Sequence, residues 1–310
     1  LPSEPRHLNP MLSGDSVAVG ITLGDVYEPL LLAPRAGLRP VPHLAASVSN
    51  SPEGLTWTFV LRPGVLFHDG TRLSADDVVV SFMLAKSVVG PLRGEFDDLA
   101  SATASGPTTV VLRFSESRPG REEAIAMVPI VSAKAFGDVD PTTLHRTPAS
   151  RQPNGTGALQ VIRFSAGEVE LVRHQEYWGP ASRAARILYR VIPERARAAT
   201  ELRAGKLDVL MGLPVDEAVQ LTQEDSDLAL VRLRMPAYTA AVFNTENPRL
   251  HVGARGALSR SFDRQSIIGE LFRGHADIAL GPFLRHGPRE GSLPAQSAFV
   301  LKKAQAELRV

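Results

Sequence analysis

The segment 55–81 reads LTWTFVLRPGVLFHDGTRLSADDVVVS and carries the clearest structural signals of this 310-residue chain. From Leu55 to Leu61 large apolar residues fill every second position, which predicts a strand with one buried face. Arg62-Pro63-Gly64 and His68-Asp69-Gly70 are turn sequences, and they enclose a second short strand, Val65–Phe67. The segment therefore predicts a strand followed by a tight hairpin.

A helix is predicted directly after this hairpin. Ser74 is placed to cap its first turn, and carboxylates at Asp76 and Asp77 favour the positive end of a helix. Apolar residues then recur at helical spacing as far as Lys86. A further strand, Thr108–Phe114, follows a Ser-Gly-Pro turn.

Strands and helices continue to alternate along the rest of the chain. This order predicts an α/β or α+β fold. Strands are expected at 159–164, 169–173, 187–192, 207–211, 228–233 and 240–243. Helices are expected at 17–27, 194–204, 255–272 and 298–309.

Composition excludes several classes of protein. Hydrophobic residues make up 44% and charged residues 22% of the chain, which is typical of a folded globular protein. The 34 Lys and Arg balance 33 Asp and Glu, so the surface lacks the basic excess of a nucleic-acid binder. The chain has no Cys, which excludes disulfides, thiolate catalysis and Cys-ligated zinc. No apolar run approaches the ~18 to 20 residues of a membrane helix.

The standard catalytic and metal-binding signatures are missing. The sequence contains no G-x-S-x-G, H-E-x-x-H or G-x-x-x-x-G-K-[ST] motif, and its eight His include no i, i+4 pair. Ser13-Gly14-Asp15-Ser16 is similar to a protease nucleophile loop, but no partner His is anchored beside it. We therefore predict no catalytic residue, no metal and no cofactor, and we favour a binding protein.

Two further motifs each have two interpretations. Asn154-Gly155-Thr156-Gly157 is either a backbone nest for an anion or a tight turn whose glycines take positive φ before a strand. Tyr177-Trp178-Gly179-Pro180 is either an aromatic platform for a ligand or a turn that closes the hydrophobic core. We favour the structural interpretation of both.

Several segments together resemble the family 5 extracellular solute-binding proteins, the peptide/nickel-type receptors of ABC importers. The strand-hairpin-helix segment 55–81 carries the family signature. Six other motifs follow the family's order: Leu8–Pro10 with Val26–Leu30, Gly155–Gly157, Glu176–Gly179, Leu202–Val209, Phe243–Thr245, and the helix Ala257–Ile268. The resemblance covers about residues 5–285, although Ala158-Leu159 stand where the family has Pro-Tyr.

The resemblance implies a periplasmic-binding-protein-like type II lobe with an inserted α+β subdomain, of the cluster C type. Residues 1–40 and 152–275 would form the two parts of lobe I, and residues 41–151 the inserted subdomain. Residues 276–310 would form the hinge and the start of lobe II. Relatives are much longer, so most of the second lobe is expected to be absent from these 310 residues.

The resemblance also implies a function and a site. Family members close two lobes around a solute and present it to a membrane permease. The positions that line the cleft in the family fall here on Ser13, Asp15, Ser16, Arg93, Phe96, Tyr238 and Asn244. Arg93 would grip a carboxylate, while Phe96 and Tyr238 would supply apolar walls.

The expected partners are a peptide-like or small chelate ligand, an ABC permease, and a second polypeptide or a homo-oligomer that completes the cleft. The expected location is the periplasm or the cell surface of a bacterium. Two alternatives stay open: a sensor or interaction module on the same receptor fold, and an enzyme of unrecognised type. No nucleic acid is expected as a partner.

Overall fold

The structure is a computed structural model that describes residues 1–12, 15–33, 39–88, 92–231, 239–278 and 305. The chain divides into two compact units. Unit 1 comprises Leu1–Pro34 and Arg39–Ala198, and unit 2 comprises Arg35–Leu38 and Ala199–Val310.

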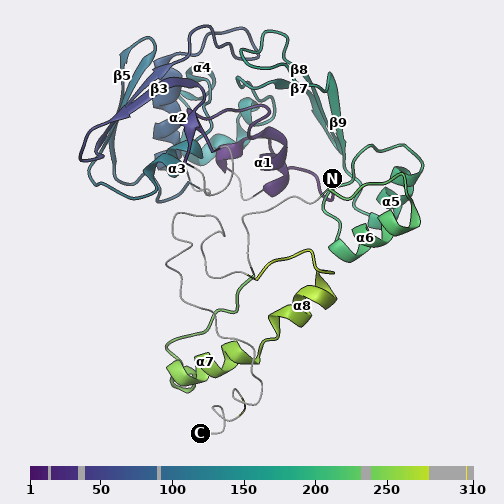
Figure 1. Cartoon of the computed structure of the whole chain (residues 1–310). Coiled ribbons are helices and arrows are strands. Elements are labelled where there is room, and N and C mark those ends of the chain that lie inside the picture. Colours follow the sequence, from purple (N-terminus) through teal and green to yellow (C-terminus); the bar gives the residue numbers. More distant parts are fainter. Residues whose placement is uncertain (13–14, 34–38, 89–91, 232–238, 279–304, 306–310) are drawn as a thin grey trace. The chain divides into compact units, whose positions relative to one another are not determined.

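A four-stranded antiparallel sheet with the strand order β3-β4-β6-β5 forms one part of unit 1 (Figure 1). The predicted strand at its centre is confirmed as β4, in which alternate side chains are buried. The predicted strand after the Ser-Gly-Pro turn is β6. The bounds are β3 Ala45–Asn50, β4 Thr56–Leu61, β5 Leu99–Gly106 and β6 Thr109–Phe114.

Helix α2 (Ala75–Ser87) packs against β5 and β6 and confirms the predicted helix. Its first turn is a capping box, in which the Ser74 backbone N–H donates to Asp77 Oδ2 at 2.8 Å. The other oxygen of this carboxylate accepts from the Ala133 backbone N–H at 2.7 Å. The carboxylate of Asp77, predicted for the first turn, therefore also ties α2 to the start of the short helix α4 (Ala133–Phe136).

The predicted strand Val65–Phe67 is wrong. The hairpin forms a single β-bridge, between Leu66 and Arg72, and the Phe67 N–H donates to the Thr71 carbonyl at 2.8 Å. The turn at 68–70 reverses the chain after only a few residues, so a ladder of more than one bridge does not form. Val65 and Phe67 are nevertheless buried, so the apolar residues enter the core without regular pairing.

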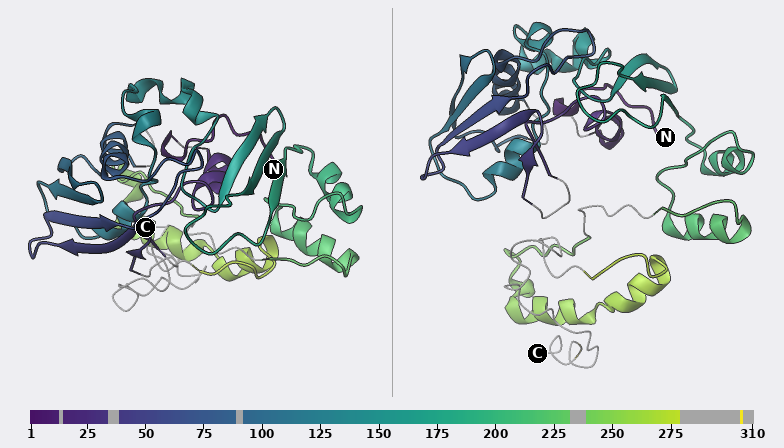
Figure 2. Two further views of the ribbon diagram at one scale, coloured as in Figure 1. Left: turned by 90° about the horizontal axis from the view of Figure 1, so that it is seen from above. Right: turned by 45° about the horizontal axis from the view of Figure 1, so that its top comes forward.

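Unit 1 also contains a three-stranded antiparallel sheet, β7-β8-β9, and a two-stranded one, β1-β2 (Figures 1 and 2). The three strands predicted for 159–192 are confirmed, and the predicted first helix is shorter than expected. The bounds are α1 Ser16–Thr22, β1 Leu31–Leu32, β2 Val41–Pro42, α3 Arg121–Ala126, β7 Leu159–Ser165, β8 Glu168–Arg173 and β9 Arg186–Arg190; 3-10 turns cover Pro10–Leu12, Pro141–Arg146 and Pro148–Ser150.

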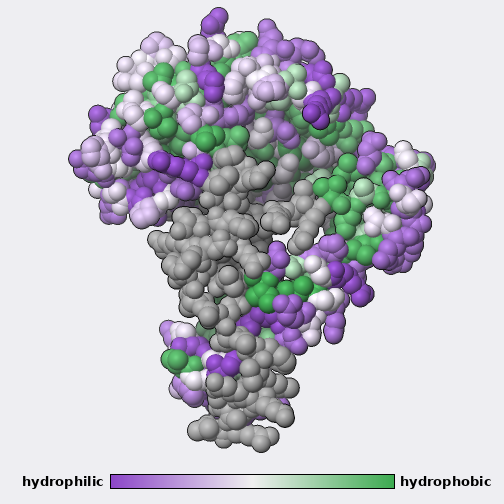
Figure 3. Space-filling model, viewed as in Figure 1, coloured by the Kyte–Doolittle hydropathy of each residue, from purple (hydrophilic) through white to green (hydrophobic). Residues whose placement is uncertain are grey.

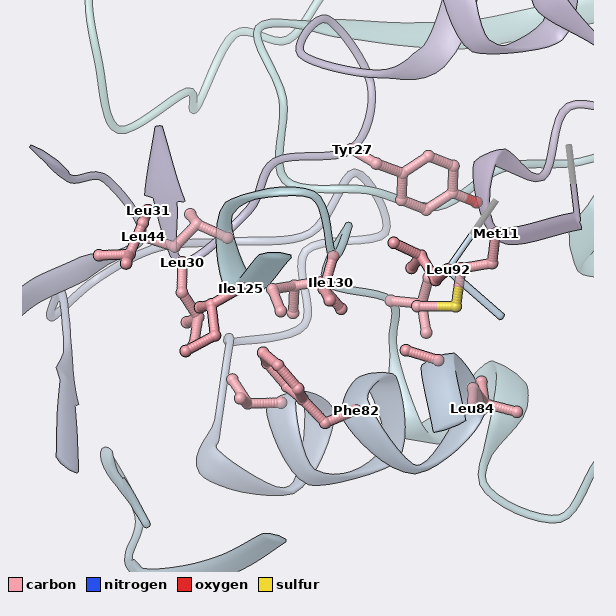
Figure 4. Packing of buried hydrophobic residues seen from close by; sticks show 14 of the residues in the cluster. Met11, Tyr27, Leu30, Leu31, Leu44, Phe82, Leu84, Leu92, Ile125 and Ile130 are labelled. Atoms are coloured by element: carbon pink, nitrogen blue, oxygen red, sulfur yellow. The ribbon is translucent and has the colours of Figure 1, made fainter. Parts of the chain in front are cut away.

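One continuous hydrophobic cluster holds unit 1 together, and all of its buried members lie between Leu8 and Leu171. Figure 4 shows part of it, where Phe82 of α2 lies near Ile125 and Ile130. The cluster joins the N-terminal segment, the four-stranded sheet and the β7-β8 pair. Burial of this apolar surface is the main stabilising contribution to unit 1.

The regular elements of unit 2 in the described residues are helices, with a 3-10 turn at Pro248–Leu250. The predicted helix 194–204 is confirmed and ends before Gly205, whose φ of 66° suits a glycine. Helix α6 was not predicted, although Val215, Ala218 and Val219 recur at helical spacing and acidic residues occupy its first turn. The bounds are α5 Arg195–Arg203, which begins in unit 1, α6 Val215–Glu224, α7 Val252–Ser261 and α8 Arg264–Leu271.

The strands predicted in unit 2 are not found where the structure describes the chain. Residues 207–211, 228–231 and 240–243 form no ladder, and Val242 is 92% exposed. An apolar run becomes a strand only when a neighbouring strand accepts its hydrogen bonds. No such neighbour pairs with these runs among the described residues.

The predicted helix 255–272 is two helices. Phe262 leaves the helical conformation, and Asp263 starts α8 by accepting the Ser266 backbone N–H at 3.1 Å. The carboxylate competes with the continuing helix for a backbone donor, which favours a break there. The predicted helix Ala298–Arg309 lies outside the described residues except for position 305.

Candidate ligand-binding site

The predicted positions near the N-terminus lie at the start of α1. Asp15 Oδ1 accepts the backbone N–H groups of Val17 and Ala18 at 3.0 and 3.2 Å, and Oδ2 accepts the Arg6 N–H at 3.1 Å. Asp15 is therefore the cap of this short helix. Ser16 is its first residue and is exposed. Ser13 lies outside the described residues.

Arg93 and Phe96 occupy the turn that leads into β5, but their surroundings differ. Arg93 is exposed, as a residue that binds a solute carboxylate must be. Phe96 is 0% exposed and packs edge-on against Phe82, with 5.5 Å between ring centroids. Phe96 therefore belongs to the core of the subdomain in this structure and offers no apolar wall to a ligand.

The remaining predicted positions belong to unit 2. Asn244 is exposed, and its Oδ1 accepts the Glu246 backbone N–H at 3.0 Å in a local turn. Tyr238 lies outside the described residues. The predicted positions are thus divided between unit 1, with Asp15, Ser16 and Arg93, and unit 2, with Asn244.

A buried carboxylate that was not predicted lies at the centre of unit 1. Glu28 is 0% exposed and accepts four side-chain hydrogen bonds. Its Oε1 lies 2.8 Å from His43 Nε2 and 2.7 Å from the Tyr177 hydroxyl. Its Oε2 lies 2.7 Å from the Thr156 hydroxyl and 3.1 Å from Trp178 Nε1. We call these five residues the Glu28 cluster.

The Glu28 cluster explains why the distant family-like motifs occur together. A buried carboxylate is stable only when its oxygens are hydrogen-bonded, and here the donors come from three separate segments. Burial and the neighbouring Glu28 charge raise the pKa of Tyr177, so this hydroxyl stays a donor. The sequence signal was a single acidic residue within the apolar stretch VYEPLLL at 26–32.

The aromatic turn at 177–178 is part of the core, as favoured from the sequence. Trp178 is half-buried against the main cluster, and the Arg62 guanidinium lies over its ring at 4.9 Å. The Trp178 ring is therefore engaged by Arg62 and by Glu28, groups of the protein itself. The structural interpretation of this motif is confirmed.

The glycines of the turn 154–157 are needed for close backbone approach. A Cβ on Gly155 would lie 1.9 Å from the Val26 carbonyl oxygen, and one on Gly157 would lie 2.1 Å from that of Asp25. Neither glycine has the positive φ that was expected. The turn docks against residues 25–26, where the Gly157 N–H donates to the Val26 carbonyl at 3.0 Å. The motif is a structural turn, because its Gly157 N–H already donates to the protein and not to an anion.

Over the described ranges, no group of three or more His, Asp or Glu is arranged to hold a metal ion. Within the same ranges no helix combines the length and apolarity needed to cross a membrane.

Comparison with solved structures identifies the fold. The structure of NikZ from Campylobacter jejuni in complex with Ni(L-His) superposes with a TM-score of 0.81 at 24% identity, covering 99% of this chain and 61% of that one. The chain accordingly has the α/β fold of type II periplasmic binding proteins, and it matches about three fifths of such a molecule.

Sequence relatives show the same partial coverage. The oligopeptide-binding protein AppA of Bacillus subtilis is 24% identical over 286 residues, which are 90% of this chain and 52% of AppA. Protein XP55 of Streptomyces lividans is 31% identical over 289 residues, 90% of this chain and 50% of XP55. The chain spans about half the length of these relatives.

The family model of the bacterial extracellular solute-binding proteins, family 5 (middle), matches residues 39–309. That range contains the strand-hairpin-helix signature, the glycine turn and the aromatic turn of the Glu28 cluster. The family consists of binding proteins that serve ABC importers in the periplasm or outside the cell, not of enzymes. The chain belongs to the bacterial extracellular solute-binding proteins of family 5.

Proposed function

We propose that this chain is the solute-binding component of an ABC-type importer, which captures a peptide-like or small chelate ligand and delivers it to a membrane permease. The observation that carries the proposal is the family match over residues 39–309. The ligand classes are those named for two similar proteins, an oligopeptide for AppA and a nickel-histidine complex for NikZ. The proposed location is the periplasm or the cell surface.

The proposed domain boundaries follow the architecture of the family. Residues 1–40 and 152–275 would form lobe I, 41–151 the inserted subdomain, and 276–310 the hinge with the start of lobe II. The ligand would enter an interlobe cleft and close it by contacts to both walls. Because the chain spans about half the length of its relatives, we propose that further polypeptide, in the same protein or in a partner or second copy, completes the cleft.

Three described residues are proposed to contact the ligand, and three others belong to the proposed site. Arg93 would form paired hydrogen bonds with a carboxylate. Ser16 and Asn244 are exposed and would contribute polar contacts. Asp15 would act through α1, since its carboxylate already caps that helix. Ser13 and Tyr238 complete the proposed set.

The test is a titration of the 310-residue chain with an oligopeptide mixture and, separately, with nickel-histidine. We expect saturable binding to one class with a dissociation constant in the millimolar range, about −4 kcal/mol, because part of the ligand stays exposed. NMR line shifts would detect such weak binding. Micromolar binding by a monodisperse monomer would show that the 310 residues hold a complete site.

A pair of variants separates a real site from nonspecific adhesion. Arg93→Ala should weaken binding at least threefold, whereas Arg113→Ala, which removes an exposed Arg from β6, should leave it unchanged. Equal losses in both variants would mean that the ligand follows general charge. Absence of saturable binding to either class would overturn the solute-binding proposal.

A further inference from the structure

His68 connects two parts of unit 1 through both nitrogens of its ring. Its Nε2 lies 3.0 Å from the Gly157 carbonyl oxygen, and its Nδ1 lies 3.3 Å from the Gly155 backbone nitrogen. The carbonyl can only accept and the amide can only donate. The ring is therefore neutral, with its proton on Nε2, and the lone pair of Nδ1 accepts the Gly155 N–H.

The hairpin that carries His68 makes two further bonds to the same turn. The His68 backbone N–H donates to the Gly155 carbonyl at 2.9 Å, and the Asp69 N–H donates to Asn154 Oδ1 at 3.1 Å. These contacts join the middle of the 55–81 segment to residues almost 90 positions later. They connect the proposed inserted subdomain to the proposed second part of lobe I.

A second histidine contacts the same carbonyl but with a different chemical consequence. His174 Nδ1 lies 3.3 Å from the Gly157 oxygen, and its ring meets His68 edge-on at 4.9 Å between centroids. A proton added to His174 would enter at Nε2 and leave the Nδ1–H donor in place. A proton added to His68 must enter at Nδ1, where it would face the Gly155 N–H as a second donor.

We propose that His68 is an acid-operated latch that holds the hairpin 65–73 to the turn 154–157 when its ring is neutral and releases it when the ring is protonated. The remainder of the turn stays anchored, because Gly157 donates to Val26 and Thr156 donates to Glu28. Opening is therefore local. It loosens the joint between the subdomain and the lobe without unfolding either.

The charges around His68 set the pH at which the latch opens. The pKa of His68 is lowered to about 4, chiefly by burial and also by the neighbouring His174, while the hydrogen bond to the Gly157 carbonyl and the charges of Glu28 and Asp69 oppose the shift. Asp69 itself lies 3.6 Å from the Lys134 ammonium. The unfolded ring would titrate near 6.5, so the latch is closed above that pH and opens as the pH falls toward 4.

The test uses the 310-residue chain and two amides of the same turn. Between pH 6 and 4 we expect the hydrogen exchange of Gly155, divided by that of Gly157, to rise about tenfold per pH unit, because the open fraction follows the protonated fraction. The His68 ring resonance should titrate with a midpoint near 4. Equal loss of protection at Gly155 and Gly157, or a midpoint near 6.5, would overturn the proposal.

Two variants add a matched comparison. His68→Gln keeps a donor but cannot titrate, so the Gly155 to Gly157 exchange ratio should become independent of pH. His174→Gln removes only the neighbouring ring, and the pH dependence should persist with its midpoint moved slightly upward. An unchanged pH profile in His68→Gln would assign the opening to another group. If that variant does not fold, the ring titration of the parent chain decides the question.

Discussion

The described residues of the two units differ in how fully their apolar side chains are buried. In unit 1, all buried members of the main hydrophobic cluster fall between Leu8 and Leu171, and three separate segments donate hydrogen bonds to Glu28. Among the described residues of unit 2, the buried apolar residues are Leu221, Ala254 and Ala257. Figure 3 shows apolar surface in the regions of α5, α6 and α8.

A sequence motif needs a partner segment in order to form paired structure. Segments of unit 1 find their partners within the described residues, so their strands pair and their buried polar groups are satisfied. Apolar runs of unit 2 at 207–211 and 240–243 have no such partner there, and Val209 and Val242 remain exposed. Four predictions address this contrast.

The largest effect is expected at the buried carboxylate. Glu28→Ala leaves four donors without an acceptor and opens a cavity, so we expect a loss of about 4 kcal/mol in the free energy of unfolding of unit 1. Denaturant unfolding followed by Trp fluorescence measures it, because both Trp residues, Trp57 and Trp178, lie in unit 1.

The matched control for this prediction is Glu224→Ala in unit 2. Glu224 is exposed and accepts hydrogen bonds from Arg203 and from Gln220. An exposed ion pair contributes about 0 to 1 kcal/mol, so this variant should unfold at nearly the same denaturant concentration as the parent when unfolding is followed by far-UV circular dichroism, which also reports the helices of unit 2. Equal destabilisation by both variants would remove the distinction between the units.

The next effect is expected at the glycine turn. Gly157→Ala forces a methyl group against the Asp25 carbonyl and should cost about 3 kcal/mol. Gly20→Ala is its control, because no atom lies within 4 Å of the added Cβ in α1, and Ala should stabilise the helix by about 0.5 to 1 kcal/mol. The melting temperature and the denaturant midpoint should both fall for Gly157→Ala and both rise for Gly20→Ala.

A smaller effect is expected at Trp178. The ring is half-buried rather than fully buried, so Trp178→Ala should cost about 2 to 3 kcal/mol, at the low end for an aromatic truncation. Trp178→Phe keeps a ring but removes the Nε1–H donor to Glu28, and should cost about 1 kcal/mol. A melting temperature within a degree of the parent in both variants would mean that the ring contributes little to the core.

Local patterns predicted part of unit 1. Alternation predicted β4 and β7, turn and partner signals predicted β6 and β8, and the Ser74 cap placed α2 to within one residue, whereas β3, β5, α3 and α4 were not predicted. These signals are local because the periodicity of side chains and the satisfaction of a helix end involve only neighbouring residues. The resemblance supplied the fold class, which the solved structures confirm.

Long-range contacts were not predictable in the same way. Glu28 was missed as a central residue because its four donors lie 15 to 150 positions away, and no local pattern reveals a shared acceptor. Phe96 was expected at a surface, but an apolar ring in a Gly-rich turn does not show whether it faces inward. The strands of unit 2 failed for the same reason, since pairing depends on a partner rather than on the run itself.

The smallest effect is expected for the exposed valines of unit 2. Val209→Ser and Val242→Ser remove side chains that are 72% and 92% exposed, so each should change the free energy of unfolding by less than about 0.5 kcal/mol. Val110→Ala, at a fully buried position of β6, should cost about 2 kcal/mol by contrast. Val209→Ser and Val242→Ser should also lower self-association of the chain in sedimentation experiments, because exposed apolar surface promotes contact between copies. If either serine variant destabilised the chain as much as Val110→Ala, its valine would be packed in solution, and the contrast between the two units would be lost.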